Sequence, residues 1–255
     1  MGRRTTYRAL AVACAAVVGA VLLSGSDQPV TARSYPHWQE LPPPPLAPRI
    51  HALGVPAGHR VLVLGGFLAG VAVRNGAAYD LRTGIWRRLH TPVSFSDRDR
   101  AVVAAGVVVV RHRTSSGASW WTYDVGDMAW SRLREVPAHL SVPSAFGSEV
   151  YAVSGRRVAV YSVQLGRWTT RPIDPRRQAL RNATVAASRD GTVVTGHPVG
   201  HPQRLVADRW DGLRWRRTRV TRTAPVEAAP DGSTRVSLGG RTLVVRGDRA
   251  WIRLP

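Results

Sequence analysis

Two histidines, His197 and His201, lie four positions apart in the segment His-Pro-Val-Gly-His. Two imidazoles at this spacing could bind one metal ion. The intervening Pro198 and Gly200 exclude a helix, on which both rings would share one face. The neighbouring sequence offers no obvious third ligand. We therefore expect a polar loop here and predict no metal site.

The aspartates form two groups with different expected roles. Asp97 and Asp99 lie in a polar segment flanked by arginines, so we expect ion pairs with those neighbours rather than calcium binding or acid–base chemistry. Asp80, Asp124 and Asp211 each follow an aromatic residue at an equivalent place in the chain. A short polar side chain before a turn accepts backbone hydrogen bonds, so these three are predicted to be turn residues.

Trp120 and Trp121 form a doublet in a segment with strand character. Successive side chains of a strand point to opposite faces, so one ring should be in the core and the other at a surface or an interface. An exposed indole could stack on a sugar ring. We therefore keep Trp120, Trp121, His197 and His201 as possible ligand contacts, and predict no catalytic or cofactor-binding residue.

Several kinds of chemistry are excluded by composition. Cys14 is the only cysteine, and it lies in an apolar N-terminal stretch. The rest of the chain therefore has no disulfide, thiolate metal site or cysteine nucleophile. No phosphate-binding loop, dinucleotide fingerprint or serine-hydrolase elbow is present, and we expect no cofactor.

Residues 1–32 have the composition of an export segment. Arginines open the segment, an uncharged apolar run of about 15 residues spans 9–23, and small residues precede a cleavage point after Ala32. The apolar run is shorter than the roughly 20 residues of a typical spanning helix. We predict a cleaved signal peptide, with retention as an N-terminal membrane anchor as the alternative. Either way, the domain is expected outside the cytoplasmic membrane, and it contacts the membrane only if this segment is retained.

The formal net charge is +20, and all 36 basic residues are arginines. Many of them alternate with apolar residues, which is typical of the solvated face of a strand. Complete absence of lysine indicates a GC-rich coding sequence rather than a phosphate-binding surface. We expect no specific nucleic-acid binding. Anionic cell-surface polymers remain possible partners because the charge would attract them.

Six tryptophans recur about 36 to 48 residues apart, each followed by a short polar or basic run. They are Trp38, Trp86, Trp130, Trp168, Trp215 and Trp251. A period near 40 residues with one aromatic anchor per unit is typical of a propeller array.

Within three units a tyrosine precedes the tryptophan by seven residues, and apolar strands and turn residues surround both. The pairs are Tyr79 and Trp86, Tyr123 and Trp130, and Tyr161 and Trp168. Constant spacing predicts one hairpin register for all three. Double glycines, Gly65-Gly66 and Gly239-Gly240, follow strands of the first and last units. No amphipathic helix follows the export segment, so an all-β domain is expected.

This pattern of double glycine, tyrosine and tryptophan resembles the kelch repeat family, and its rhythm is similar to secreted actinobacterial proteins related to the central domain of galactose oxidase. The resemblance covers residues 38–255, although the full motif occurs only in the first unit. It implies a β-propeller of four-stranded blades over 50–255, after a proline-rich lead-in at 33–49 that contains the first edge strand. Galactose oxidase activity is excluded, because its copper radical site needs a cysteine that this domain lacks.

Five units predict five blades, with six possible. In this interpretation Trp251 occupies the closing strand. Either Trp38 adds to or replaces an outer strand of the last blade, or the ring is imperfect. We expect an exported, non-catalytic scaffold that binds a protein or a glycan. The alternatives are a carbohydrate-active enzyme with its site at the channel mouth, or an electrostatic binder of anionic polymers.

Overall fold

The computed structural model describes residues 38–173, 179–189, 191–201, 203–211, 214–218, 234–238, 241–246 and 249–253. The chain divides into two compact units, Met1–Tyr35 and Pro36–Pro255, and every described residue lies in the second. These residues form strands and no helix, so this part of the chain has no helix able to span a membrane. The predicted export segment and Gly239-Gly240 lie outside the described residues.

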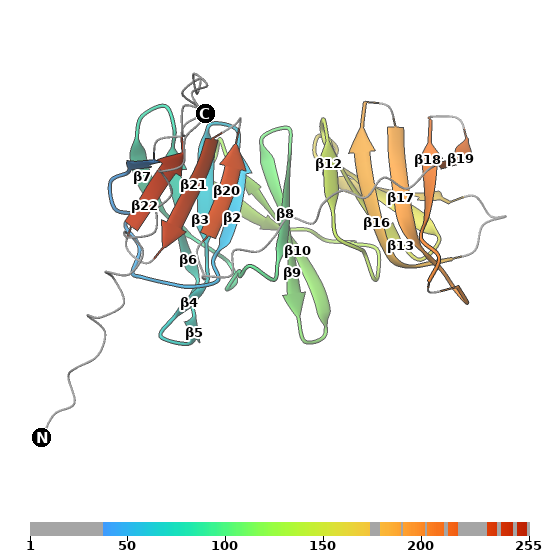
Figure 1. Cartoon of the computed structure of the whole chain (residues 1–255), viewed down its shortest axis with the longest axis horizontal. Coiled ribbons are helices and arrows are strands. Elements are labelled where there is room, and N and C mark those ends of the chain that lie inside the picture. Colours follow the sequence, from blue (N-terminus) through green and yellow to red (C-terminus); the bar gives the residue numbers. More distant parts are fainter. Residues whose placement is uncertain are drawn as a thin grey trace, which may run out of the picture. The chain divides into compact units, whose positions relative to one another are not determined.

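Five four-stranded antiparallel sheets make up the domain, which is the architecture of a multi-blade β-propeller (Figure 1). The first sheet contains β2 (Leu53–Ala57), β3 (Arg60–Leu64), β6 (Asn75–Asp80) and β7 (Ile85–His90). The second contains β8 (Arg100–Ala104), β9 (Val107–Thr114), β10 (Gly117–Asp124) and β11 (Ala129–Arg132). The third contains β12 (Ser144–Phe146), β13 (Glu149–Ser154), β14 (Arg157–Ser162) and β15 (Arg167–Pro172). The fourth contains β16 (Leu180–Ser188), β17 (Gly191–Pro198), β18 (Val206–Trp210) and β19 (Trp215–Thr218). The fifth contains β20 (Thr234–Leu238), β21 (Arg241–Arg246), β22 (Arg249–Arg253) and β1 (Trp38–Glu40). The predicted all-β fold is confirmed.

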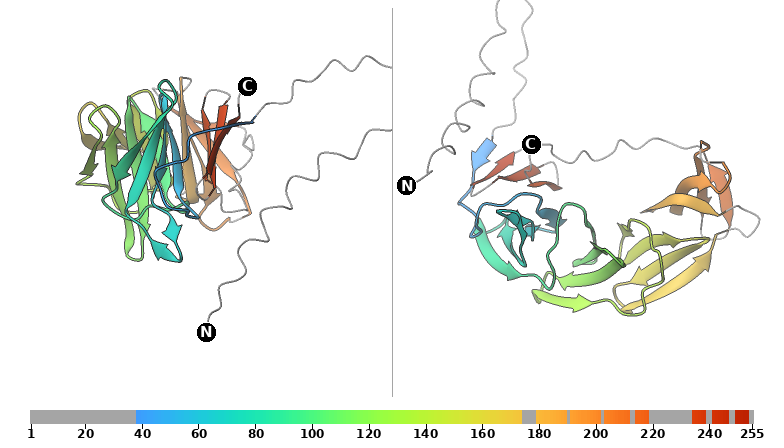
Figure 2. Two further views of the ribbon diagram at one scale, coloured as in Figure 1. Left: turned by 90° about the vertical axis from the view of Figure 1, so that its left-hand side faces the viewer. Right: turned by 90° about the horizontal axis from the view of Figure 1, so that it is seen from below.

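Consecutive sheets lie side by side, and their first strands contact one another: β20 with β2, β2 with β8, β8 with β12, and β12 with β16 (Figure 2). A sheet between two neighbours buries both of its faces, so its central strands are continuously apolar. The run Val108–Val110 on β9 illustrates this, since none of its side chains is exposed. Val108 and Val110 pack towards the first sheet and Val109 towards the third.

An aromatic pair spans the third and fourth strands of each of the first four sheets. The pairs are Tyr79 with Trp86, Tyr123 with Trp130, Tyr161 with Trp168, and Trp210 with Trp215. Their ring centroids are 4.8 to 5.5 Å apart. The segment that arrives from the preceding sheet covers the pair, as Phe95 does on Trp130 at 5.1 Å. Each pair therefore joins its own hairpin and the connection before it.

The fifth sheet is built from both ends of the domain. Strand β1 pairs with β22, placing Glu40 opposite Trp251 and Trp38 opposite Arg253. Trp251 therefore lies on the third strand, and the prediction that it occupies the closing strand is wrong. Trp38 is on the outermost strand of this sheet, as predicted. The N-terminal strand completes the sheet and pairs its open edge, which would otherwise be a template for association.

Candidate functional site

The connections between sheets converge at one end of the strands. The described connections enter at the start of a first strand, and the turn between the second and third strands lies at the same end. We call this end the loop face; it includes residues 91–99, 115–116 and 133–143. The hairpin of β4 (Phe67–Leu68) and β5 (Val71–Ala72) and the tip of the β9–β10 hairpin project from it (Figure 1).

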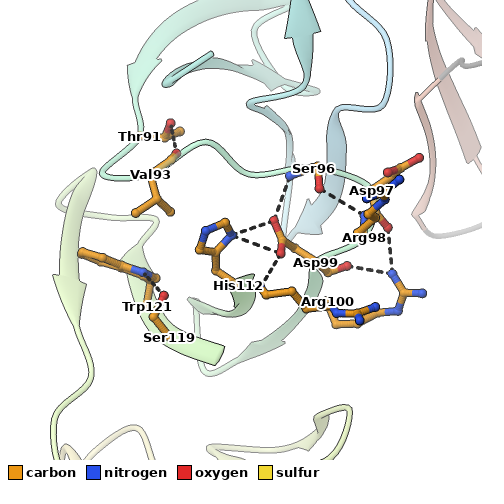
Figure 3. Close-up of polar contacts among 11 residues, drawn as sticks. Thr91, Val93, Ser96, Asp97, Arg98, Asp99, Arg100, His112, Ser119 and Trp121 are labelled. Atoms are coloured by element: carbon orange, nitrogen blue, oxygen red, sulfur yellow. Dashed lines mark hydrogen bonds and ion pairs between the residues drawn. The ribbon is translucent and has the colours of Figure 1, made fainter. Parts of the chain in front are cut away.

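A buried aspartate ties the loop face together (Figure 3). The side chain of Asp99 is 1% exposed and accepts hydrogen bonds from the backbone N–H groups of Ser96 and Arg113, each at 2.8 Å. His112 Nδ1 lies 3.1 Å from the same carboxylate. These contacts join the buried side chain of Asp99 to the loop that carries Ser96 and to β9, so Asp99 fixes the loop 91–99 against β9.

The partners of the aspartates differ from those we expected. Asp97 pairs with His51, whose Nδ1 lies 2.7 Å from its carboxylate. Arg100 donates to the backbone carbonyl oxygens of Asp97 and Asp99, not to their side chains. The expected ion pairs with flanking arginines are thus replaced by histidine and backbone contacts. Asp80 and Asp124 accept backbone N–H groups of the following turns.

A cavity of about 440 Å³ lies beside this anchor, on the other side of the β9–β10 hairpin. We call it the Arg111 cavity. It draws its lining from β9, the 133–143 loop, the β13–β14 turn and the first residues of β16, so three sheets contribute. Its polar side chains are those of Arg111, His139, Ser141, Asn182 and Thr184.

Arg111 is the charged group of this cavity. Its Nε donates to the backbone oxygen of Leu140 at 3.2 Å, and among the described residues no carboxylate forms an ion pair with it. Burial lowers the pKa of Arg111, and the positive charge of Arg113 lowers it further. The carboxylate of Asp99 acts on the pKa of Arg111 in the opposite direction. A guanidinium keeps its charge despite such a shift, so the cavity holds a cation that is not ion-paired with any described carboxylate, and this favours an anion.

The backbone around the cavity adopts rare conformations. His139 and Asn182 both have positive φ, 56° and 49°. A β-bulge interrupts the pairing of β16 with β17 between Arg181 and Thr184 and redirects Asn182. A Cβ on Gly196 would lie 2.9 Å from the Cβ of Leu180, so only glycine lets the bulge lie this close. Rare backbone geometry of this kind often accompanies ligand sites.

The tryptophan doublet divides between the two faces of β10. Trp120 is 2% exposed and meets Trp168 edge-on at 5.5 Å, so it offers no free ring face for stacking. Trp121 is half-buried, donates from Nε1 to Ser119 Oγ, and has Arg132 at 6.0 Å over its ring. The two rings therefore contribute to packing on opposite sides of the second sheet.

The histidine pair lies on the fourth sheet, apart from the tryptophans. His197 lies within β17, not in the expected loop, and its buried Nδ1 has no hydrogen-bond partner among the described residues, whereas His201 is exposed after the turn that follows. No group of three or more His, Cys, Asp or Glu side chains that could hold a metal ion occurs in the described part of the chain. The sequence analysis did not identify Arg111, His139 or Asn182, because they are distant in sequence and Arg111 is one arginine among many. The one sequence feature that could have indicated the β-bulge is Gly196, because it interrupts a strand of valines and threonines.

No family model matches this sequence, and none of the curated proteins matches it either. Among solved structures, one described as "Structure of YjhT" is similar at 12% sequence identity and a TM-score of 0.43, over 82% of this chain and 81% of that one. Similarity at this level does not transfer a function.

Proposed function

We propose that this protein is an exported, non-catalytic β-propeller of the kelch type that binds a protein or a glycan at the cell envelope through its loop face. The observation that carries the proposal is the Arg111 cavity, where segments of three sheets surround a cation with which none of the described carboxylates forms an ion pair. The Asp99 anchor supports it as well, because a rigid loop loses little conformational entropy on binding. Export is inferred from the N-terminal segment.

The character of the cavity favours binding over glycoside hydrolysis. Hydrolysis of this kind generally uses two carboxyl groups that flank the scissile bond. No carboxylate is among the residues that line the Arg111 cavity. The nearby Asp99 is buried and already accepts three hydrogen bonds, so it is not available to a substrate.

A second candidate function, electrostatic binding of anionic surface polymers, is favoured by the net charge of +20. Such binding depends on counterion release and falls steeply with salt. A loss of about tenfold or more between 50 and 200 mM salt, equal for all polyanions tested, would favour this function over a specific site.

The absence of cysteine after Cys14 allows a direct test of the loop face. Ser116→Cys at the tip of the β9–β10 hairpin can be coupled to a bulky polymer, and Thr83→Cys, in a turn at the opposite end of the first sheet, is the matched control. Both proteins are then applied to a glycan array and to envelope extracts. We expect coupling at position 116 alone to block binding. Blocking only by the control adduct would place the binding surface at the other end.

Export has a separate test. Protein recovered from the medium or the envelope of the producing cell should begin at Arg33, as read by N-terminal sequencing. Mature protein that retains Met1 would support the membrane anchor instead.

A further inference from the structure

We propose that the Arg111 cavity binds the carboxylate of an acidic glycan, a polymer that contains uronic acid, with Arg111 as the anion contact. The inference rests on the proposed function as a binding scaffold and specifies its ligand class.

Arg111 carries the positive charge that would bind the carboxylate. The guanidinium of Arg111 donates from Nε to the Leu140 carbonyl oxygen, which holds the group in place, and its terminal N–H groups form no hydrogen bond with the described residues. One planar guanidinium matches one carboxylate in charge and in geometry. Recognition of a phosphate dianion generally recruits a cluster of arginines or a row of backbone N–H groups, and this cavity lining provides only one arginine.

His139 and Asn182 provide polar groups for the hydroxyl groups of the sugar. The side chains of His139 and Asn182 are exposed into the cavity region and form no hydrogen bond with the described residues. An amide and an imidazole can both donate and accept, as the hydroxyl groups of a sugar require. Both residues owe their positions to positive φ, and Asn182 also to the bulge. The site therefore combines a carboxylate contact with hydroxyl contacts.

Arginines near Arg111 would attract an anionic polymer to the cavity. Arg113 is exposed two residues further along the same strand, and its charge and that of Arg100 both act on Arg111. Positive charge at the mouth of a cavity increases the local concentration of anionic polymers. Arg113 does not line the cavity, so it contributes attraction without specific contact.

The test is calorimetric titration of the mature protein with a galacturonic acid trimer, its methyl ester and a neutral galactose trimer at one fixed salt concentration. We expect the acid to bind and the two uncharged probes to bind at least about tenfold more weakly. Arg111→Gln should lower affinity for the acid about tenfold or more. Arg113→Gln, which removes the same charge from the same strand, should change it by less than about threefold.

Asn182→Asp keeps the size of the side chain and tolerates positive φ, so it tests the site even if Arg111→Gln disturbs the 133–143 loop. Its carboxylate should pair with Arg111 and reduce binding of the acid by about tenfold or more, with an unchanged unfolding midpoint. Absence of binding by the unmodified protein, equal binding of acid and ester, or equal losses in the two arginine variants would overturn the inference. If the loop face still binds another ligand in the blocking experiment above, the proposed function stands without it.

Discussion

Replacing Gly65 with alanine tests how the loop face is attached to the first sheet. Gly65 has a φ of 62°, and a Cβ built on it would lie 2.0 Å from the backbone oxygen of Phe95 and 2.7 Å from its backbone nitrogen. Both are main-chain atoms, so no side-chain rotation relieves the overlap. The oxygen of Phe95 also accepts the N–H of Gly66 at 2.7 Å, and movement away from the new methyl group would break that bond.

The expected loss of stability follows from these contacts. Left-handed backbone at a residue with a Cβ costs about 1–2 kcal/mol. Loss of the buried hydrogen bond to Gly66 costs about 1–3 kcal/mol. Displacement of Phe95, which is fully buried against Trp130, adds a packing loss of about 1–3 kcal/mol. We therefore expect Gly65→Ala to lower the free energy of unfolding by about 3–8 kcal/mol, a large part of the roughly 5–15 kcal/mol of a typical domain.

The assay is urea unfolding of the mature protein, followed by tryptophan fluorescence. Gly58→Ala is the matched control, because Gly58 has nearly the same φ, 63°, and no atom within 4 Å of its missing Cβ. It should cost only about 1–2 kcal/mol. A Gly65→Ala loss within about 1 kcal/mol of the control would refute the reasoning, since the connection at Phe95 would then be free to move.

Three further predictions use the same unfolding assay. Trp130→Ala should lower the free energy of unfolding by about 3–5 kcal/mol because its ring packs on Phe95, and a loss under about 1 kcal/mol would contradict that packing role. Asp99→Asn should cost about 1–3 kcal/mol, since one buried backbone donor loses its acceptor; an unchanged midpoint would mean that solvent reaches the site. Burial, followed by a hydrogen bond to Glu149, raises the pKa of Tyr151 to about 12, above the value near 10 of an unfolded tyrosine. Neutral Tyr151 thus stabilises the fold fully below pH 10, and stability should fall between pH 10 and 12 less in Tyr151→Phe than in the unmodified protein; equal slopes would exclude this group.

The hairpins were predictable because their determinants are local. Tyr79 and Trp86 are seven residues apart, and this spacing with a turn between them places the two rings directly opposite each other. The same arithmetic applies to Tyr123 with Trp130. Alternation of apolar residues and short turns is enough to specify such units without knowledge of their neighbours.

The order of strands in the fifth sheet was not predictable in the same way. The segments that begin at Trp38 and at Trp251 are similar in composition. Nothing in either segment indicates whether it forms the third or the fourth strand of a sheet. The pairing of β1 with β22 joins residues more than 200 positions apart, and only the geometry of the assembled sheets selects it.

By itself, the sequence determined that this chain forms a series of similar antiparallel sheets in which an aromatic pair joins two neighbouring strands. Hydrophobic alternation and aromatic spacing are enough for this, because both act over a few residues. The tertiary structure alone decided that Arg111, one of many arginines, lines this cavity. Arg111 lies on the second sheet, His139 in the loop between the second and third sheets, and Asn182 on the fourth sheet, and they line one cavity only because the sheets pack face to face. Convergence of this kind depends on contacts between distant segments, which leave no periodic trace in the order of residues.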